Sequence, residues 1–153
     1  MKLKIKKYPD PVLRKKAGPV YRITAADKQL LDDMLETMYE AKGIGLAAPQ
    51  IGISRRIAVI DTGYGPIKMV DPEIISKKGM SQLEEGCLSI PDRAVNIKRA
   101  DELTVSYIDE DNKRREIHLT GLAARAVQHE IDHLNGRLII DYIAWYKKFF
   151  VNR

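Results

Sequence analysis

The chain has 153 residues, of which 44% are hydrophobic and 31% are charged, and its formal net charge is +5. This composition is that of one globular domain that can bury a core without disulfide support. A single cysteine excludes an internal disulfide, and no stretch approaches the roughly 20 apolar residues that span a bilayer. The positively charged start lacks a following apolar run, so we expect no signal peptide, no membrane contact and a cytoplasmic protein.

The first third of the chain predicts an arm and a helix. Residues 8–20, "YPDPVLRKKAGPV", contain three prolines and a glycine, which favours an irregular arm with at most one short helix. A long amphipathic helix is predicted from Thr24 to Lys42. Its apolar residues recur at helical spacing, at Leu30, Leu31, Met34, Leu35 and Met38. Thr24 is a suitable N-cap with Asp27 three residues later, and Gly43 stands where the helix should stop.

The middle of the chain has the pattern of β-strands. We predict strands in "RRIAVID", "IKMVDPEIIS", "AVNIKR", "LTVSYID" and "RREIHL". The turn "GYGP" separates the first two, and the polar turn "EDNK" separates the last two. Pro72 is expected to break the second strand, since proline cannot donate to a strand ladder.

The last third predicts a second main helix and a short final one. The second helix should begin near Thr120 and end at Asn135-Gly136, a strong stop signal. "DYIAWYKKFFV" predicts a final short helix with Asp141 as its cap. Strands between two main helices, without βαβ alternation, indicate an α+β fold with mixed or antiparallel strands around the second helix. The absence of repeats and linkers favours a single domain over residues 1–153.

The second predicted helix carries "QHEIDHL", in which His129 and His133 are four residues apart. In a helix these side chains share one face, so both imidazoles can bind one ion. Glu130 would lie close to that ion without binding it. H-E-x-x-H on a helix is a pattern of metal hydrolases, which usually have three protein ligands and one water. The plainer alternative is a partly buried helix whose histidines form local hydrogen bonds.

A third ligand has to come from upstream, because no Glu or His follows His133. Asp141 is the only later acid, and the final helix needs it as a cap. His118 alternates with apolar residues in a predicted strand, so we interpret it as a structural or surface residue. Cys87 is the only thiol in the chain, and its setting is unlike that of a plain core strand. A thiolate with two imidazoles would make a three-ligand site with an open fourth position.

Cys87 lies in "EEGCLSIP", where Gly86 permits close backbone approach and Pro91 is expected to end the strand. A lone cysteine can equally be a small buried hydrophobe. Another alternative makes Cys87 a nucleophile with a histidine base. That alternative leaves the second histidine and Glu130 without a task, so we prefer the metal site.

Three motifs together resemble bacterial-type peptide deformylases: "GIGLAAPQ" at 43–50, "EGCLSIP" at 85–91 and "QHEIDHL" at 128–134. Their order and separations are similar to those of the family, and the resemblance covers nearly the whole chain. It implies a metal-dependent hydrolase that removes the formyl group from the N-terminal formylmethionine of nascent polypeptides and releases formate. The implied partners are N-formylmethionyl nascent peptides, and no specific DNA contact is expected.

The resemblance also implies residue roles. The family's metal ligands and catalytic groups fall on Cys87, His129, His133, Glu130, Gln50 and Leu88. The first three would be the ligands, and Glu130 the general acid and base. The Gln50 side chain and the Leu88 backbone N–H would donate to the formyl oxygen. The implied native metal is Fe(II), with zinc often found in its place and nickel or cobalt supporting activity.

The expected substrate-binding residues are Ile44, Gly45, Glu85, Arg93, Leu122 and Ala126. Ile44 and Gly45 resemble family residues that pair with the peptide as an added strand. Arg93 resembles an arginine near the peptide's downstream carbonyls. The other three are assigned from their spacing to the pocket for the methionine side chain. Taken alone, "GIGLAAPQ" could be a glycine-rich turn with no ligand.

Three other functions are alternatives. A zincin-like endopeptidase would cleave internal peptide bonds, but the downstream ligand is missing. An inactive deformylase-like protein is disfavoured by intact Gln50, Leu88 and Glu130 positions. A metal-stabilised module could bind ribosomal RNA through the basic "WYKKFF" end, with salt-sensitive binding that Glu130→Gln leaves intact. We prefer an amphipathic helix there, and the short carboxy-terminal end leaves open whether the protein associates with the ribosome.

Overall fold

The computed structural model describes residues 2–143, so residues 1 and 144–153 lie outside the description. The elements in chain order are η1 (Pro11–Arg14), α1 (Ala25–Glu40), β1 (Gly45–Ala47), η2 (Ala48–Ile51), β2 (Ile57–Ile60), β3 (Ile67–Lys78), β4 (Ser81–Cys87), β5 (Ile90–Arg99), β6 (Glu102–Ile108), β7 (Arg114–Thr120), α2 (Gly121–Leu134) and η3 (Ile139–Tyr142). An antiparallel five-stranded sheet has the order β1-β2-β3-β6-β7, and β4 and β5 form a separate hairpin. The predicted α+β class is confirmed.

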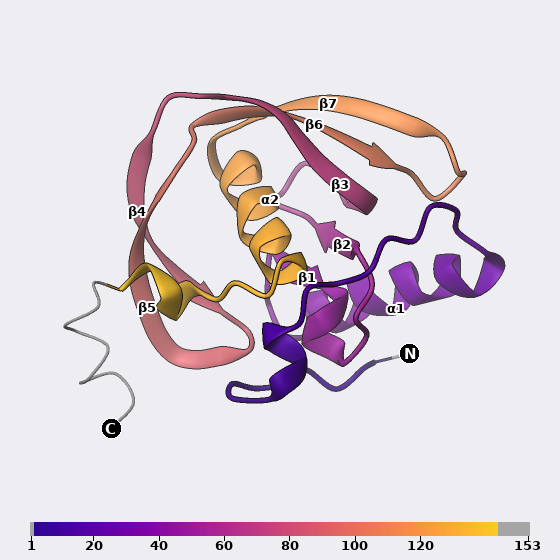
Figure 1. Ribbon diagram of the computed structural model, residues 1–153, viewed down its shortest axis with the longest axis horizontal. Helices are drawn as coiled ribbons and strands as arrows, with labels where there is room; N and C mark the ends of the chain where they lie inside the picture. Colours follow the sequence, from indigo (N-terminus) through magenta and orange to yellow (C-terminus); the bar gives the residue numbers. More distant parts are fainter. Residues whose placement is uncertain (1, 144–153) are drawn as a thin grey trace.

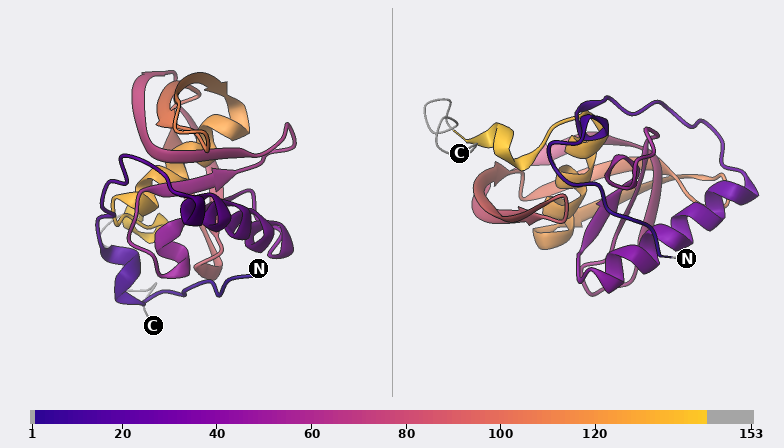
Figure 2. Two further views of the ribbon diagram at one scale, coloured as in Figure 1. Left: turned by 90° about the vertical axis from the view of Figure 1, so that its right-hand side faces the viewer. Right: turned by 90° about the horizontal axis from the view of Figure 1, so that it is seen from below.

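The five-stranded sheet packs against a different helix on each face. In β2, Ile57 and Val59 belong to the apolar cluster around α1, whereas Ala58 and Ile60 belong to the cluster around α2. Successive residues of a strand point to opposite faces, so all four side chains are buried. Figure 1 shows α2 in the middle of the molecule, with α1 at the end opposite the β4–β5 hairpin. The right-hand view of Figure 2 shows the same arrangement from below.

Helix α1 begins as the sequence predicts. The Thr24 hydroxyl accepts from the Asp27 N–H at 3.3 Å, and the Asp27 carboxylate accepts from the Thr24 N–H at 2.9 Å. The helix ends at Glu40, slightly before the predicted end. Lys42, with φ of 60°, takes the left-handed position that the sequence suggested for Gly43. The Gly43 N–H then donates to a carbonyl of the last helical turn, and the chain continues into β1.

Helix α2 carries both histidines of the H-E-x-x-H motif and has the predicted bounds. Thr120 precedes it in extended conformation, although its side chain makes no capping hydrogen bond. Gly136 follows the helix with φ of 76°, the left-handed conformation that favours glycine. A Cβ there would lie 2.5 Å from the Arg14 carbonyl oxygen. Gly136 is therefore required both by its backbone conformation and by the packing of the amino-terminal arm.

Pro72 was predicted to break a strand and Pro91 to end one, but both lie inside strands. Pro72 lies inside β3, where the register with β6 shifts between Val70 and Glu73. Asp71 has φ of 48° there, so a β-bulge accommodates the proline without ending the strand. Pro91 is the second residue of β5 rather than the end of a strand.

The last described residues also differ from the prediction. The short 3-10 helix η3 begins at Ile139, and Asp141 caps it from its third position by accepting from the Leu138 N–H at 2.9 Å. The rest of the predicted final helix lies outside the described residues. In the part of the chain that is described, no helix is long and apolar enough to cross a membrane.

Candidate metal centre and active site

The three predicted metal ligands come together from two elements. Cys87 is the last residue of β4, and His129 and His133 lie on α2. The Cys87 Sγ is 3.2 Å from the His133 Nε2, which is 3.2 Å from the His129 Nε2. These three atoms all lie within 4.8 Å of one another, and we call Cys87, His129 and His133 the ligand cluster. Ligand atoms around a tetrahedral ion are about 3.3–3.7 Å apart, so this donor set fits one divalent ion.

The hairpin turn that presents the thiol is held by the amino-terminal arm. Cys87 is followed by a two-residue turn, Leu88 and Ser89, before β5 begins. The Tyr8 N–H donates to the Ser89 carbonyl at 2.8 Å, and the Lys7 ammonium donates to the Leu88 carbonyl at 2.9 Å. These bonds fix the turn, and with it the position of the sulfur opposite α2.

The imidazole of His129 is oriented by a buried carboxylate. The His129 Nδ1 lies 3.0 Å from the Glu85 Oε1. Glu85 also accepts two hydrogen bonds from Arg99, at 2.9 and 3.0 Å, and one from Arg125 at 2.6 Å. Burial alone would raise the pKa of Glu85, but the hydrogen bonds from His129 and Arg99 hold it at about 2. The ionised carboxylate therefore accepts from Nδ1 and turns Nε2 towards the ligand cluster.

The electrostatic environment of the two imidazoles favours one positive charge. Burial lowers the pKa of His129, but Glu130, Cys87 and Glu85 outweigh it and raise the value to about 10. The pKa of His133 is lowered well below its usual value by burial and by the neighbouring His129. The neighbouring carboxylates of Glu130 and Glu85 therefore favour a positive charge at His129.

Two buried side-chain atoms in residues 2–143 have no hydrogen-bond partner there, Glu130 Oε1 and His133 Nδ1. Buried polar atoms are nearly always paired, so an unpaired one calls for an explanation in function. Burial raises the pKa of Glu130 to about 7. Its carboxyl group can therefore gain or lose a proton near neutral pH, as a general acid or base must.

The amide of Gln50 is fixed with its N–H₂ end towards the thiol. Gln50 lies in η2 and is almost completely buried. Its Oε1 accepts from the Ala47 N–H at 2.9 Å, while its Nε2 donates to the Ser89 hydroxyl at 3.2 Å. The same Nε2 is 3.6 Å from the Cys87 Sγ. The Leu88 N–H follows Cys87 directly in the chain, so both predicted donors lie at the ligand cluster.

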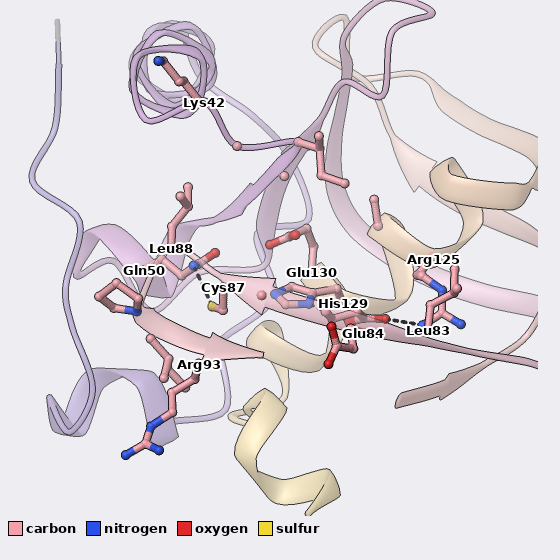
Figure 3. A pocket seen from close by; sticks show the side chains of 18 of the residues that line it. Lys42, Gln50, Leu83, Glu84, Cys87, Leu88, Arg93, Arg125, His129 and Glu130 are labelled. Carbon is pink, nitrogen blue, oxygen red and sulfur yellow. Dashed lines mark hydrogen bonds and ion pairs between the residues drawn. The ribbon is translucent and has the colours of Figure 1, made fainter. Parts of the chain in front are cut away.

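A pocket of about 480 Å³ opens over this cluster. Its lining includes all of the predicted substrate-binding residues, Ile44, Gly45, Glu85, Arg93, Leu122 and Ala126. Strand β1 is the edge strand of its sheet, so the backbone around Gly45 borders the pocket. In Figure 3 the Arg93 side chain extends away from Cys87 and His129. The third histidine, His118, is exposed on β7 and lies 3.2 Å from Glu102, as a surface residue.

Glycines near the site differ in what they make room for. A Cβ at Gly45 would collide with the carboxylate of Glu130. At Gly43 it would lie 2.8 Å from a terminal methyl of Leu88, which can rotate away. At Gly86 a Cβ would lie an ordinary 3.8 Å from the Arg93 carbonyl oxygen. Of these three positions, Gly45 is therefore the one that strictly requires glycine.

Sequence reasoning missed the arginines around Glu85. Arg99 and Arg125 are both buried, at 4% and 6% exposure, and both form ion pairs with Glu85. Arg125 precedes His129 by four residues on α2, so helical spacing could have placed it on the same face. The position of Arg99 depends on the pairing of β4 with β5, which no local pattern reveals.

The family model for polypeptide deformylase matches residues 2–149. The chain belongs to the polypeptide deformylase family. A peptide deformylase from Halothermothrix orenii is 51% identical to the enzyme over 143 residues, which cover 92% of this chain and 93% of the relative. The crystal structure of one from Legionella pneumophila superposes with a TM-score of 0.94 at 44% identity, covering 100% of this chain and 92% of that one.

A peptide deformylase from Acinetobacter baumannii, with Met-Ala-Ser bound, superposes on the enzyme with a TM-score of 0.87. It is 36% identical and covers 94% of this chain and 99% of that one. The enzyme is a metal-dependent hydrolase that removes the formyl group from the N-terminal formylmethionine of nascent polypeptides and releases formate. The alternative of a zincin-like endopeptidase is therefore wrong.

Proposed function

We propose that the enzyme holds one divalent ion on the Cys87 Sγ, the His129 Nε2 and the His133 Nε2. The spacing of these atoms and the open pocket beside them support a three-ligand site. Fe(II) is proposed as the native metal from the family resemblance, because affinity alone would favour zinc. Zinc, nickel or cobalt can occupy the same donors. When bound, the ion supplies Lewis-acid chemistry, lowering the pKa of water and polarising the formyl oxygen.

Glu130 is assigned the proton transfers. The observation that carries this assignment is a buried carboxyl with an unpartnered oxygen, on the same helix as both histidines. Glu130 takes a proton from the attacking water and gives it to the departing amine. One water and one formamide thereby become formate and a free amino terminus. A pKa of about 7 suits both directions of transfer, which together contribute roughly 10²–10⁴-fold to rate.

Gln50 and Leu88 are assigned as donors to the formyl oxygen. The carbonyl end of the Gln50 amide is held by the Ala47 N–H, so its Nε2 is the end that faces the ligand cluster. The Leu88 N–H follows ligand Cys87 in a turn that the amino-terminal arm fixes. A preorganised donor of this kind is worth roughly 3–4 kcal/mol in the transition state.

The substrate peptide is proposed to pair with the edge of β1 at Ile44 and Gly45, as an added strand. Leu122 and Ala126, on the first turns of α2, would line the space for the methionine side chain. Arg93 would contact the downstream part of the peptide. The relative from Acinetobacter baumannii that binds Met-Ala-Ser supports a peptide of this kind.

Glu85 is assigned a different task from the expected substrate contact. Both of its oxygens accept hydrogen bonds from Arg99, and Arg125 and His129 use the same oxygens. A carboxylate so occupied is suited to orienting the His129 imidazole. We therefore propose Glu85 as a partner of the metal ligand rather than of the peptide.

We further propose that residues 1–153 act as one catalytic domain in the cytoplasm, where formylated chains are synthesised. Association with the ribosome concerns the basic end of the chain. Residues 144–153 lie outside the described part, so ribosome association stays a prediction.

The test is formate release from a formyl-Met peptide by anaerobically purified enzyme of measured metal content. Glu130→Gln should keep its metal, because Glu130 is not a ligand, and should lose roughly 10²–10⁴-fold in kcat. Glu116→Gln, on the exposed strand β7, is the matched control and should behave as the wild type. A metal-loaded wild type that releases no formate, or a fully active Glu130→Gln enzyme, would overturn the assignment.

A further inference from the structure

Arg99, the last residue of β5, joins two groups of side chains. Its Nε and Nη2 donate to the two oxygens of Glu85, at 3.0 and 2.9 Å. Its Nη1 donates to the Asp132 carboxylate at 2.6 Å and to the Tyr142 hydroxyl at 3.2 Å. Only 4% of the Arg99 surface is exposed, so water can do little to solvate its charge. The planar guanidinium therefore fixes the relative positions of these partners.

Tyr142, in η3, contacts both Arg99 and Asp132. Its hydroxyl donates to the Asp132 carboxylate at 2.6 Å, and its ring centroid lies 5.0 Å from the Arg99 Cζ. The Arg137 Cζ is 5.4 Å from the same ring. Neighbouring η3 residues pack in the apolar cluster that includes Ile97 of β5. The aromatic ring is thus held by several contacts, whereas the hydroxyl serves Arg99 and Asp132 alone among the described residues.

Few contacts separate Tyr142 from the ligand cluster. Arg99 fixes the Glu85 carboxylate through both oxygens, and Glu85 Oε1 lies 3.0 Å from the His129 Nδ1. Asp132 is itself on α2, between the two histidine ligands in sequence. Tyr142 does not occur among the described residues that line the substrate pocket. Direct contact with the peptide therefore does not explain its hydrogen bonds.

We propose that Tyr142 is a positioning residue for the metal ligand His129, acting through Arg99 and Glu85, so that η3 sets how tightly the ion is held. The inference rests on the proposed metal centre of Cys87, His129 and His133. Removing the direct partner of a metal-bound histidine typically costs about 10–100-fold in metal affinity. Tyr142 acts two contacts beyond that partner, through Arg99 and then Glu85, so we expect roughly a 3–10-fold faster loss of metal when its hydroxyl is removed.

The experiment compares cobalt-loaded wild type, Tyr142→Phe and Tyr39→Phe. Tyr142→Phe retains the ring and its packing and removes only the hydroxyl. Tyr39→Phe is the matched control. Tyr39 lies on α1, and its hydroxyl donates to the Asp61 carboxylate at the same distance of 2.6 Å. The rate of cobalt transfer to a chelator and the visible cobalt spectrum are measured. We expect faster transfer and an altered spectrum for Tyr142→Phe only, with an unchanged KM at saturating cobalt.

Equal rates of cobalt loss for both variants would overturn the proposal, as would a lower thermal stability of Tyr142→Phe with wild-type cobalt loss. Arg99→Lys retains the charge but cannot span Glu85 and Asp132, so it should release cobalt faster than Tyr142→Phe. Failure of the underlying ligation has a different signature. The wild type itself would then lack the thiolate–cobalt absorption that Cys87→Ser should abolish.

Discussion

Replacing Gly45 by alanine should disable the enzyme by displacing a side chain from another element. A Cβ at Gly45 would lie 2.9 Å from the Glu130 Cδ and closer still to a carboxylate oxygen. Carbon atoms in contact are normally about 3.5–4.0 Å apart, so the carboxylate has to move by roughly 0.6–1 Å. Because Glu130 is enclosed in the core, it cannot make this movement without changing its position relative to the ligand cluster.

The size of the effect follows from the proposed role of Glu130. A misplacement of about 1 Å in a reacting group can cost about 100-fold, which lies within the range for losing a general acid and base. We therefore expect kcat/KM to fall about 100-fold in Gly45→Ala, equivalent to about 2.7 kcal/mol. Gly43→Ala is the matched control. Its new methyl meets only the end of the Leu88 side chain, so we expect a loss below about 5-fold.

Formate release is measured for both alanine variants, for Glu130→Gln and for the double variant Gly45→Ala/Glu130→Gln, together with metal content. Because Gly45→Ala acts through the Glu130 carboxylate, the double variant should be no slower than Glu130→Gln alone. A Gly45→Ala enzyme with wild-type kcat/KM would refute the reasoning. So would a double variant in which the two losses multiply.

Three further outcomes are expected. The pKa of Glu85 is about 2 in the folded enzyme against 4.5 for the free group, so its stabilisation of about 3 kcal/mol is complete above pH 4.5 and is lost as the pH falls towards 2. Urea unfolding across this range measures it, and a Glu85→Gln enzyme with the same acid sensitivity would contradict it. Gly136→Ala should lower the free energy of unfolding by roughly 2–4 kcal/mol, through its φ of 76° and its contact with Arg14; unchanged urea unfolding would count against this. Ala126→Leu should raise the KM for a formyl-Met peptide by about 10-fold if Ala126 lines the methionine pocket, and identical kinetics would remove it from that pocket.

Features encoded locally could be predicted from the sequence. The spacing of His129 and His133 needs only a helix to bring the imidazoles together, and α2 provides it. The capping box of Thr24 and the stop at Gly136 are likewise short-range signals. Cys87 could be singled out as the only thiol in the chain, and the resemblance of "EGCLSIP" to the family motif implied its role as the third ligand.

Features that depend on strand pairing could not be predicted. Most residues of β4 are exposed, and the buried one is Glu85. The segment "SQLEEGC" therefore shows no apolar alternation, and its pairing with β5 defines it as a strand. That pairing brings Glu85 and Arg99 together although they are 14 residues apart. Pro72 was misread for a related reason, since a bulge against β6 removes the need for its missing N–H.

The most direct measurement is X-ray absorption at the metal edge of active enzyme purified without oxygen. We expect one sulfur and two imidazole nitrogens among the nearest neighbours of a single metal ion, with the sulfur lost in Cys87→Ser. An active, metal-loaded wild type whose metal has no sulfur neighbour would contradict the proposed centre.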